Sequence, residues 1–108
     1  MPYVLLDGAA ITDWQTFHSE CQRVFGFPTF YGRNMDAWID CMSSLRDDDG
    51  MVGVMLEPGE RLELEVRQAE ERSRRLPDVM LALVECTAFV NQRYEDAGEP
   101  PAIALVLT

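Results

Sequence analysis

The chain has 108 residues, a hydrophobic fraction of 47% and a formal net charge of −10, so we expect one packed domain over residues 1–108. The acidic excess excludes direct nucleic-acid binding, because phosphates would be repelled, and it favours a basic partner. The sequence lacks a signal peptide or a membrane-length apolar segment, and Cys21, Cys41 and Cys86 have no CxxC spacing, so we expect reduced thiols and a cytoplasmic location.

The first half of the chain predicts one strand and two helices. Tyr3–Leu6 is a short apolar run followed by a turn, as expected of a buried strand. A helix is expected to start at residues 12–15, which have the form of a capping box with Thr12 first, and to end at Gly26. Asn34 is expected to cap a second helix that runs to about Leu45.

The second half predicts two further strands and two helices. Residues 52–56 could add a hairpin strand, and the alternating run Leu62–Val66 predicts a core strand. Residues 68–75 predict a short exposed helix whose arginines, interleaved with glutamates, form a solvated face. A long helix beginning at Pro77 is apolar on most sides, which predicts central burial, and Ile103–Leu107 predicts the last strand.

This order of elements predicts the fold class. Helices between successive core strands imply a parallel sheet with right-handed crossovers. We therefore expect an α/β fold: a small, three-layer-like domain with a three-stranded parallel sheet and about four helices.

The segment 30–42 carries the clearest functional signal. Asp36 and Asp40 lie four residues apart, on one face of the second helix, while its apolar residues form a different stripe. A like-charge pair at this spacing is slightly unfavourable, and only Asp36 is close enough to the helix start to benefit from the helix dipole. Two carboxylates beside the aromatic pair Phe30-Tyr31 therefore favour a basic docking partner, and no structural role is expected for Asp40. We expect Tyr31 to point outward, because its hydroxyl tolerates water.

Other chemistry is disfavoured. Catalysis by the two aspartates would need an environment that separates their pKa values, and no histidine is near in sequence, so we do not expect an enzyme. Residues 47–49 resemble the start of a calcium loop but lack the closing glutamate, so no metal site or other cofactor is expected. His18 is expected at the edge of the core, and Cys41 and Cys86 are expected to be buried thiols.

With this element order, the sequence resembles the barstar family of intracellular ribonuclease inhibitors. The specific part of the resemblance consists of Pro28, Phe30, Tyr31-Gly32, Asn34-Met35-Asp36-Ala37 and Asp40-Cys41-Met42. Residues 62–68 and 101–108 look like the family's second core strand and closing strand, and residues 46–59 look like an insertion.

The resemblance implies a protein that plugs, one to one, the active site of a basic secreted ribonuclease or toxin nuclease domain. By motif position, Asp40 would take the place of a substrate phosphate and Asp36 would add a second charged contact. The partner-binding residues implied are Phe30, Tyr31, Arg33, Asn34, Asp36, Asp40 and Ser44. The free protein is expected to be a monomer, without membrane contact.

Two departures from the family pattern leave alternatives open. Where the family can have Gly-Trp after the second helix, this chain has Ser44-Leu45. A late contact from the last helix would come from Asn91 or Glu95, depending on the alignment. The alternative function is an immunity or adaptor protein of the same fold that binds a non-ribonuclease toxin or another partner.

Overall fold

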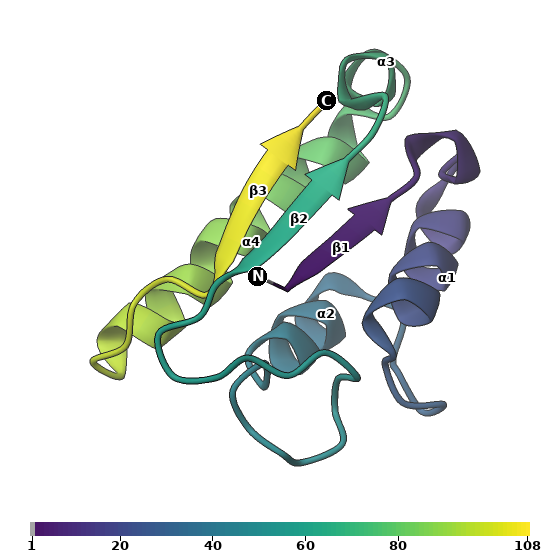
Figure 1. Cartoon of the computed structure of the whole chain (residues 1–108). Coiled ribbons are helices and arrows are strands. Elements are labelled where there is room, and N and C mark those ends of the chain that lie inside the picture. The colour runs from purple at the N-terminus through teal and green to yellow at the C-terminus, as the bar shows by residue number, and fades with distance from the viewer. Residues whose placement is uncertain (1) are drawn as a thin grey trace.

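The computed structural model describes residues 2–108 and has a three-stranded parallel sheet at its centre (Figure 1). The strands are β1 (Tyr3–Leu6), β2 (Leu62–Val66) and β3 (Ile103–Leu107). The order is β1-β2-β3, so β2 is paired on both sides, and Tyr3 lies beside Glu63 while Leu62 lies beside Ile103. The predicted α/β class and parallel sheet are therefore confirmed.

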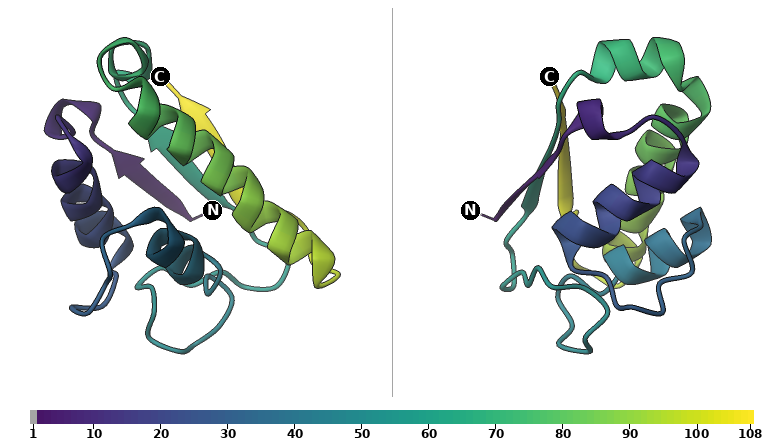
Figure 2. Two further views of the ribbon diagram at one scale, coloured as in Figure 1. Left: turned by 180° about the vertical axis from the view of Figure 1, so that it is seen from behind. Right: turned by 90° about the vertical axis from the view of Figure 1, so that its right-hand side faces the viewer.

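The helices all cover one face of the sheet (Figure 2). They are the 3-10 turn η1 (Gly8–Ala10) and the α-helices α1 (Trp14–Phe25), α2 (Met35–Met42), α3 (Ala69–Arg75) and α4 (Pro77–Asp96). Right-handed crossovers that step in the same direction place their helices on the same side of a sheet. The structure therefore has two layers rather than a three-layer-like arrangement. Among residues 2–108, every helix is too short or too polar to cross a membrane.

The core lies between the sheet and the helices. In β2 the side chains of Leu62, Leu64 and Val66 are buried, whereas Glu63 is exposed on the opposite face. This alternation is the pattern of a strand with one wet face. From α2, Trp38 is completely buried in this core.

The capping of α1 differs from the prediction by one residue. Asp13, and not Thr12, is the N-cap: its Oδ1 accepts a hydrogen bond from the Thr16 backbone N–H at 2.8 Å, and the Thr16 hydroxyl oxygen accepts one from the Asp13 N–H at 3.0 Å. The reciprocal pair satisfies two backbone N–H donors at the helix start. The capping box is therefore formed by Asp13 and Thr16, one residue later than predicted. The helix ends at Gly26, as predicted, in the left-handed conformation (φ 69°).

α2 ends at Met42, earlier than the predicted Leu45. The cause is the buried hydroxyl of Tyr94, which accepts from the Leu45 N–H at 2.9 Å and donates to the Met42 carbonyl at 3.0 Å. That hydroxyl takes the place of the next helical hydrogen bond and turns the chain toward the core. Burial raises the pKa of Tyr94 to about 12, so it remains a donor at neutral pH.

The segment 43–61 is a loop. Within residues 2–108 the sheet has three strands, so the additional hairpin strand expected at residues 52–56 is absent. Instead, the Gly53 N–H donates to the Phe25 carbonyl at 2.7 Å, and the Leu56 N–H donates to the Leu45 carbonyl at 2.8 Å. These two hydrogen bonds satisfy backbone groups of the loop without a strand partner. The side chain of Leu56, which belongs to the loop, is buried in the core.

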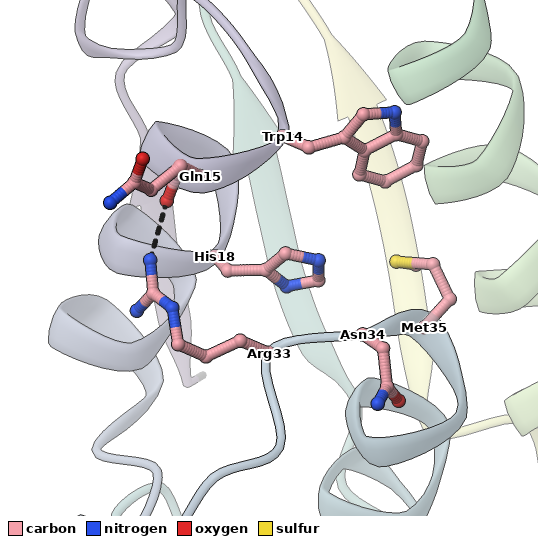
Figure 3. Close-up of a pocket in the computed structure, with 6 residues that line it drawn as sticks. All are labelled: Trp14, Gln15, His18, Arg33, Asn34 and Met35. Carbon is pink, nitrogen blue, oxygen red and sulfur yellow. Dashed lines mark hydrogen bonds between the residues drawn. The ribbon is translucent and has the colours of Figure 1, made fainter.

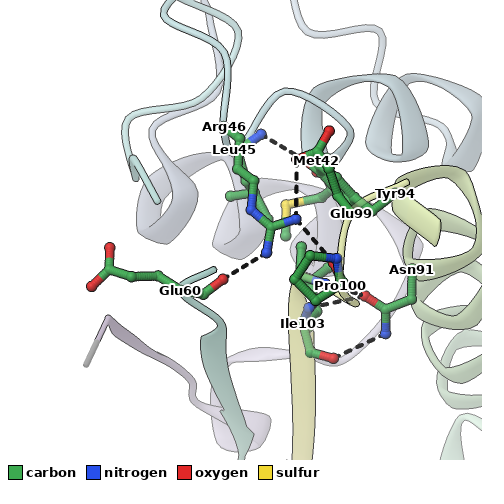
Figure 4. A network of polar contacts seen from close by, with 10 residues as sticks. Met42, Leu45, Arg46, Glu60, Asn91, Tyr94, Glu99, Pro100 and Ile103 are labelled. Carbon is green, nitrogen blue, oxygen red and sulfur yellow. Dashed lines mark hydrogen bonds and ion pairs between the residues drawn. The ribbon is translucent and has the colours of Figure 1, made fainter. Parts of the chain in front are cut away.

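Arg46 fixes this loop to the segment before β3 (Figure 4). Its side chain is only 7% exposed, and its guanidinium donates to the Glu60 carbonyl at 2.7 Å and to the Pro100 carbonyl at 2.9 Å. It also pairs with the Glu99 carboxylate at 3.3 Å and lies 5.0 Å from the centre of the Tyr94 ring. One side chain thus joins three segments that are distant in sequence.

The last two helices are less simple than their composition predicts. Leu83 and Val90 of α4 are buried, but Leu81 is 58% and Phe89 is 52% exposed, so α4 is not a central buried helix. In α3 the face is not wholly solvated, since Arg72 is buried and donates to the Ile11 carbonyl at 2.7 Å. The first difference arises because α4 packs against its neighbours along part of its surface only, and the second because α3 packs against α4 and its Arg72 side chain reaches the Ile11 carbonyl.

Candidate functional site

The two aspartates of α2 are exposed and border a groove between α2 and α4. This groove, which we call the acidic groove, has a volume of about 360 Å³ and is lined by Asp36, Ile39, Asp40, Phe89 and Arg93. The predicted separation of the helix into a buried stripe and a carboxylate face is therefore correct. The groove presents two anionic side chains beside an aromatic ring, a combination suited to binding a cation.

Asp40 has a partner within the protein, contrary to the expectation from sequence. The Arg93 guanidinium lies 3.2 Å from the Asp40 carboxylate, 3.2 Å from the Ser43 hydroxyl, and 5.2 Å from the centre of the Phe89 ring. Both charged side chains are largely exposed, and such ion pairs contribute only about 0–1 kcal/mol. Breaking the Arg93–Asp40 pair therefore costs little free energy when another cation approaches the Asp40 carboxylate.

Arg93 and Phe89 are the groove residues that the sequence analysis missed. They lie four residues apart on α4, which places them on one flank of that helix. The spacing of an aromatic residue and an arginine four positions apart could have indicated a common surface. Nothing in the local sequence, however, indicates that this flank of α4 faces α2.

The aromatic pair before α2 has the opposite orientation to the predicted one. Phe30 is 74% exposed, whereas Tyr31 is only 6% exposed, so the outward position predicted for Tyr31 is wrong. The Tyr31 hydroxyl is hydrogen-bonded to Nδ1 of the buried His18 at 2.7 Å, and its ring centre lies 4.7 Å from that of Phe27. A buried partner for the hydroxyl removes the need for water, and Tyr31 therefore anchors the loop from which Phe30 projects.

The His18–Tyr31 contact predicts a pH dependence of stability. Burial, together with the nearby Arg33 charge, lowers the pKa of His18 from 6.5. The unfolded chain therefore binds a proton more readily, so the stabilisation is complete above about pH 6.5 and is lost as the pH falls through the lower folded-state pKa. We expect the unfolding free energy to fall between about pH 7 and 5, by at most about 1.4 kcal/mol per pH unit from this group.

Urea denaturation at several pH values measures this effect. The matched variant His18→Gln keeps an amide that can bond to the Tyr31 hydroxyl but cannot titrate. Its stability should depend less on pH than that of the wild type, and parallel pH profiles for the two proteins would show that His18 is not responsible.

Arg33 and Asn34 shape the entry to α2. Arg33 has a positive φ of 56°, and its guanidinium donates to the Gln15 carbonyl and the Ser19 hydroxyl, each at 2.8 Å. The Asn34 side chain accepts from the Ala37 N–H at 2.8 Å, which confirms it as the N-cap. Together with the neighbouring residues of α1, they border a second pocket of about 480 Å³ (Figure 3). The lining residues of this pocket are Trp14, Gln15, His18, Arg33, Asn34 and Met35.

The Asn34 cap allows a direct test of how α2 is held. Asn34→Ala should destabilise the protein by about 0.5–2 kcal/mol, because an N–H at the start of α2 loses its acceptor. Asn34→Asp keeps an acceptor at the same position and should be close to wild type in thermal denaturation. Equal losses from the two substitutions would contradict a capping role.

Two further residues predicted at the surface have internal roles. Ser44 is buried, and its hydroxyl donates to the Asp49 carboxylate at 3.0 Å, so this donor is engaged within the protein. The Asn91 amide donates to the Ile103 carbonyl and accepts from the N–H groups of Ala102 and Ile103. Its side chain is thus committed to the start of β3, and the sharp turn at the end of α2 explains the burial of Ser44.

Glu95, the alternative to Asn91, is exposed on α4. It lies four residues after Asn91 and therefore shares that flank of the helix, away from Phe89 and Arg93. Neither residue lines the acidic groove.

The remaining titratable side chains are dispersed. Within residues 2–108, no three side chains of His, Cys, Asp or Glu come together as ligands for a metal ion. Cys41 is buried, and burial raises the pKa of its thiol; Cys86 is only half-buried, less than expected. His18 is enclosed with Tyr31 and is not among the residues lining the acidic groove. Among the described residues, the groove therefore presents exposed carboxylates and no metal-ligand cluster.

Comparison with known proteins identifies the family of this chain. A search of curated proteins gave no match. The family model of Barstar, described as the barnase inhibitor, matches residues 1–106 of the 108. The match covers β1, β2, all four α-helices and β3 as far as Val106, and so includes both walls of the acidic groove. The chain therefore belongs to the Barstar family.

Proposed function

We propose that this protein inhibits a basic ribonuclease by covering the enzyme's active site with the acidic groove. The observation that carries the proposal is the exposure of Asp36 and Asp40 on one face of α2, in a chain with a net charge of −10. A ribonuclease active site is positively charged in order to bind RNA phosphates, so this face complements it. Membership of a family described as barnase inhibitors supports the same reading.

In the proposed complex, Asp40 takes the place of a substrate phosphate. A guanidinium or ammonium group of the enzyme replaces Arg93 on the Asp40 carboxylate, and closure of the interface removes water and strengthens the new pair. Asp36 supplies a second anionic contact one turn away. The exposed Phe30 ring projects from the loop before α2 and contributes apolar contact beside the charges.

Barnase is the first probe for this proposal, because the family description names it. Purified protein should abolish RNA cleavage by barnase, or by a basic ribonuclease captured from the source cell, at one equivalent. The capture uses immobilised wild-type protein beside an Asp36→Asn/Asp40→Asn double variant. The proposal is overturned by two results together. Barnase is not inhibited, and the wild-type bait captures no ribonuclease beyond what the double variant captures.

Arg93 should oppose binding slightly. Arg93→Gln frees Asp40 and removes a positive charge that repels a basic enzyme, so we expect affinity for barnase or the captured ribonuclease to rise about two- to fivefold. The association rate, measured by stopped flow at low salt, should rise as well. Arg74→Gln, an identical change on the exposed side of α3, should have a smaller effect. Weaker binding of Arg93→Gln would show instead that Arg93 contacts the enzyme or positions Asp40.

The alternative of a non-ribonuclease partner would use the same groove. No feature of residues 2–108 favours it over the ribonuclease. The Leu45 side chain, which stands where the family can have an aromatic residue, is fully buried and takes no part in the surface.

A further inference from the structure

We infer that two copies of this chain associate through the free edge of β3 and the adjoining flank of α4. β3 pairs with β2 on one side only, so its other edge lies at the margin of the sheet. The strand sequence Ile-Ala-Leu-Val-Leu contains no charge, proline or glycine, the usual devices that protect an edge from pairing.

The backbone of this edge is only partly satisfied. The Ala102 carbonyl and the Thr108 N–H bond to β2, so by alternation the groups of Ile103, Leu105 and Leu107 point away from it. The Asn91 side chain satisfies both backbone groups of Ile103. The outward N–H and C=O groups of Leu105 and Leu107 have no hydrogen-bond partner within residues 2–108.

An apolar groove lies directly beside these free groups. It has a volume of about 410 Å³ and lies between α4 and the end of β3. Its lining residues are Ser73, Pro77, Met80, Leu81, Val84 and Leu107, none of which is charged. Leu81 is 58%, Leu107 is 49% and Val84 is 42% exposed, so large apolar side chains face water on a strongly acidic protein.

A second copy satisfies both features at once. An antiparallel pair centred on Val106 places Leu105 opposite Leu107 of the other copy and exchanges four hydrogen bonds, two for each such pair. The twofold axis is then perpendicular to the sheet. Both α4 helices therefore lie on the same face of the combined sheet, and their Leu81 side chains approach each other. The complementarity is between identical surfaces, as a twofold dimer requires. A lone extended peptide would satisfy the backbone groups and leave the α4 side chains exposed.

The dimer does not involve the acidic groove. Phe89 and Arg93 lie on the flank of α4 that faces α2, whereas Leu81 and Val84 lie on the flank that faces the margin of β3. Each protomer therefore keeps its groove free for one partner. The inference does not rest on the proposed function, and it replaces the monomer expected from the sequence.

Sedimentation velocity over about 1–300 μM full-length protein tests the inference, because a dimer grows with concentration by mass action. Leu81→Glu and Leu107→Pro should each raise the dimer dissociation constant by at least about tenfold. The proline removes an outward N–H and none of the bonds to β2. Met55→Glu adds the same charge at an exposed apolar residue of the 43–61 loop and should dimerise like the wild type. Circular dichroism confirms that each variant is folded.

Salt provides a second measurement. Because both protomers carry a net charge of −10, raising the salt concentration should strengthen the dimer by screening their repulsion. A wild type that remains monomeric over the whole concentration range overturns the inference. So does a dimer that Leu81→Glu and Leu107→Pro leave intact, since it must form through another face.

Discussion

Replacing Asp40 with alanine should weaken inhibition of a basic ribonuclease by about 30-fold to several thousand-fold, equivalent to about 2–5 kcal/mol. The loss is large because the enzyme's cations would remain buried in the complex without their anionic partner. The free protein should lose little stability, since the Arg93–Asp40 pair is exposed to solvent. Isothermal calorimetry with barnase or the captured ribonuclease measures the first effect, and thermal denaturation measures the second.

The structure determines which control is fair. Asp48→Ala removes an exposed carboxylate with the same charge from the neighbouring loop and should change affinity only slightly. Asp49→Ala is less suitable, because the Asp49 carboxylate accepts hydrogen bonds from the Ser44 hydroxyl and the Met51 N–H. Asp40→Asn keeps the shape of the side chain and isolates the charge. Equal affinity for Asp40→Ala and Asp48→Ala would refute the assignment of Asp40.

The second large effect concerns stability. Arg46→Met should destabilise the protein by about 2–4 kcal/mol, because the carbonyls of Glu60 and Pro100 lose charged donors in a largely enclosed site. Methionine keeps most of the side-chain volume, so the loss reports the guanidinium contacts. The unfolding free energy from urea denaturation is the measurement.

Arg74→Met is the matched control, since Arg74 is exposed on α3 and should contribute less than about 0.5 kcal/mol. Arg46→Lys keeps the charge but cannot form the planar set of bonds, so it should fall between the wild type and Arg46→Met. If Arg46→Met were as stable as Arg74→Met, the loop would have to be held by its buried apolar side chains alone.

Features governed by local chemistry were predictable from sequence. The Tyr3–Leu6 and Leu62–Val66 strands, the end of α1 at Gly26 and the Asn34 cap all depend on residues within a few positions of one another. The carboxylate face of α2 followed from helical periodicity for the same reason. The parallel sheet followed from the alternation of strands and helices.

Features that depend on distant partners were not predictable. Tyr31 turns inward because its hydroxyl forms a hydrogen bond with the ring of His18, which lies thirteen positions earlier in the chain. Asp40 is paired with Arg93 across 53 positions, and no local pattern on α4 shows which flank meets α2. The two-layer arrangement likewise depends on the order β1-β2-β3, because strand order decides which face of the sheet each crossover covers.

The central position of β2 has a consequence for how the protein is made. β1 leaves the ribosome first but pairs only with β2, whose residues Glu63 to Val66 are synthesised far later. Sheets built from such non-local pairs fold slowly, because the intervening chain must be ordered before any pair is gained. The second wall of the acidic groove, α4, follows later still. A nascent chain therefore lacks a complete acidic groove, and both walls of the groove are present only near the end of synthesis.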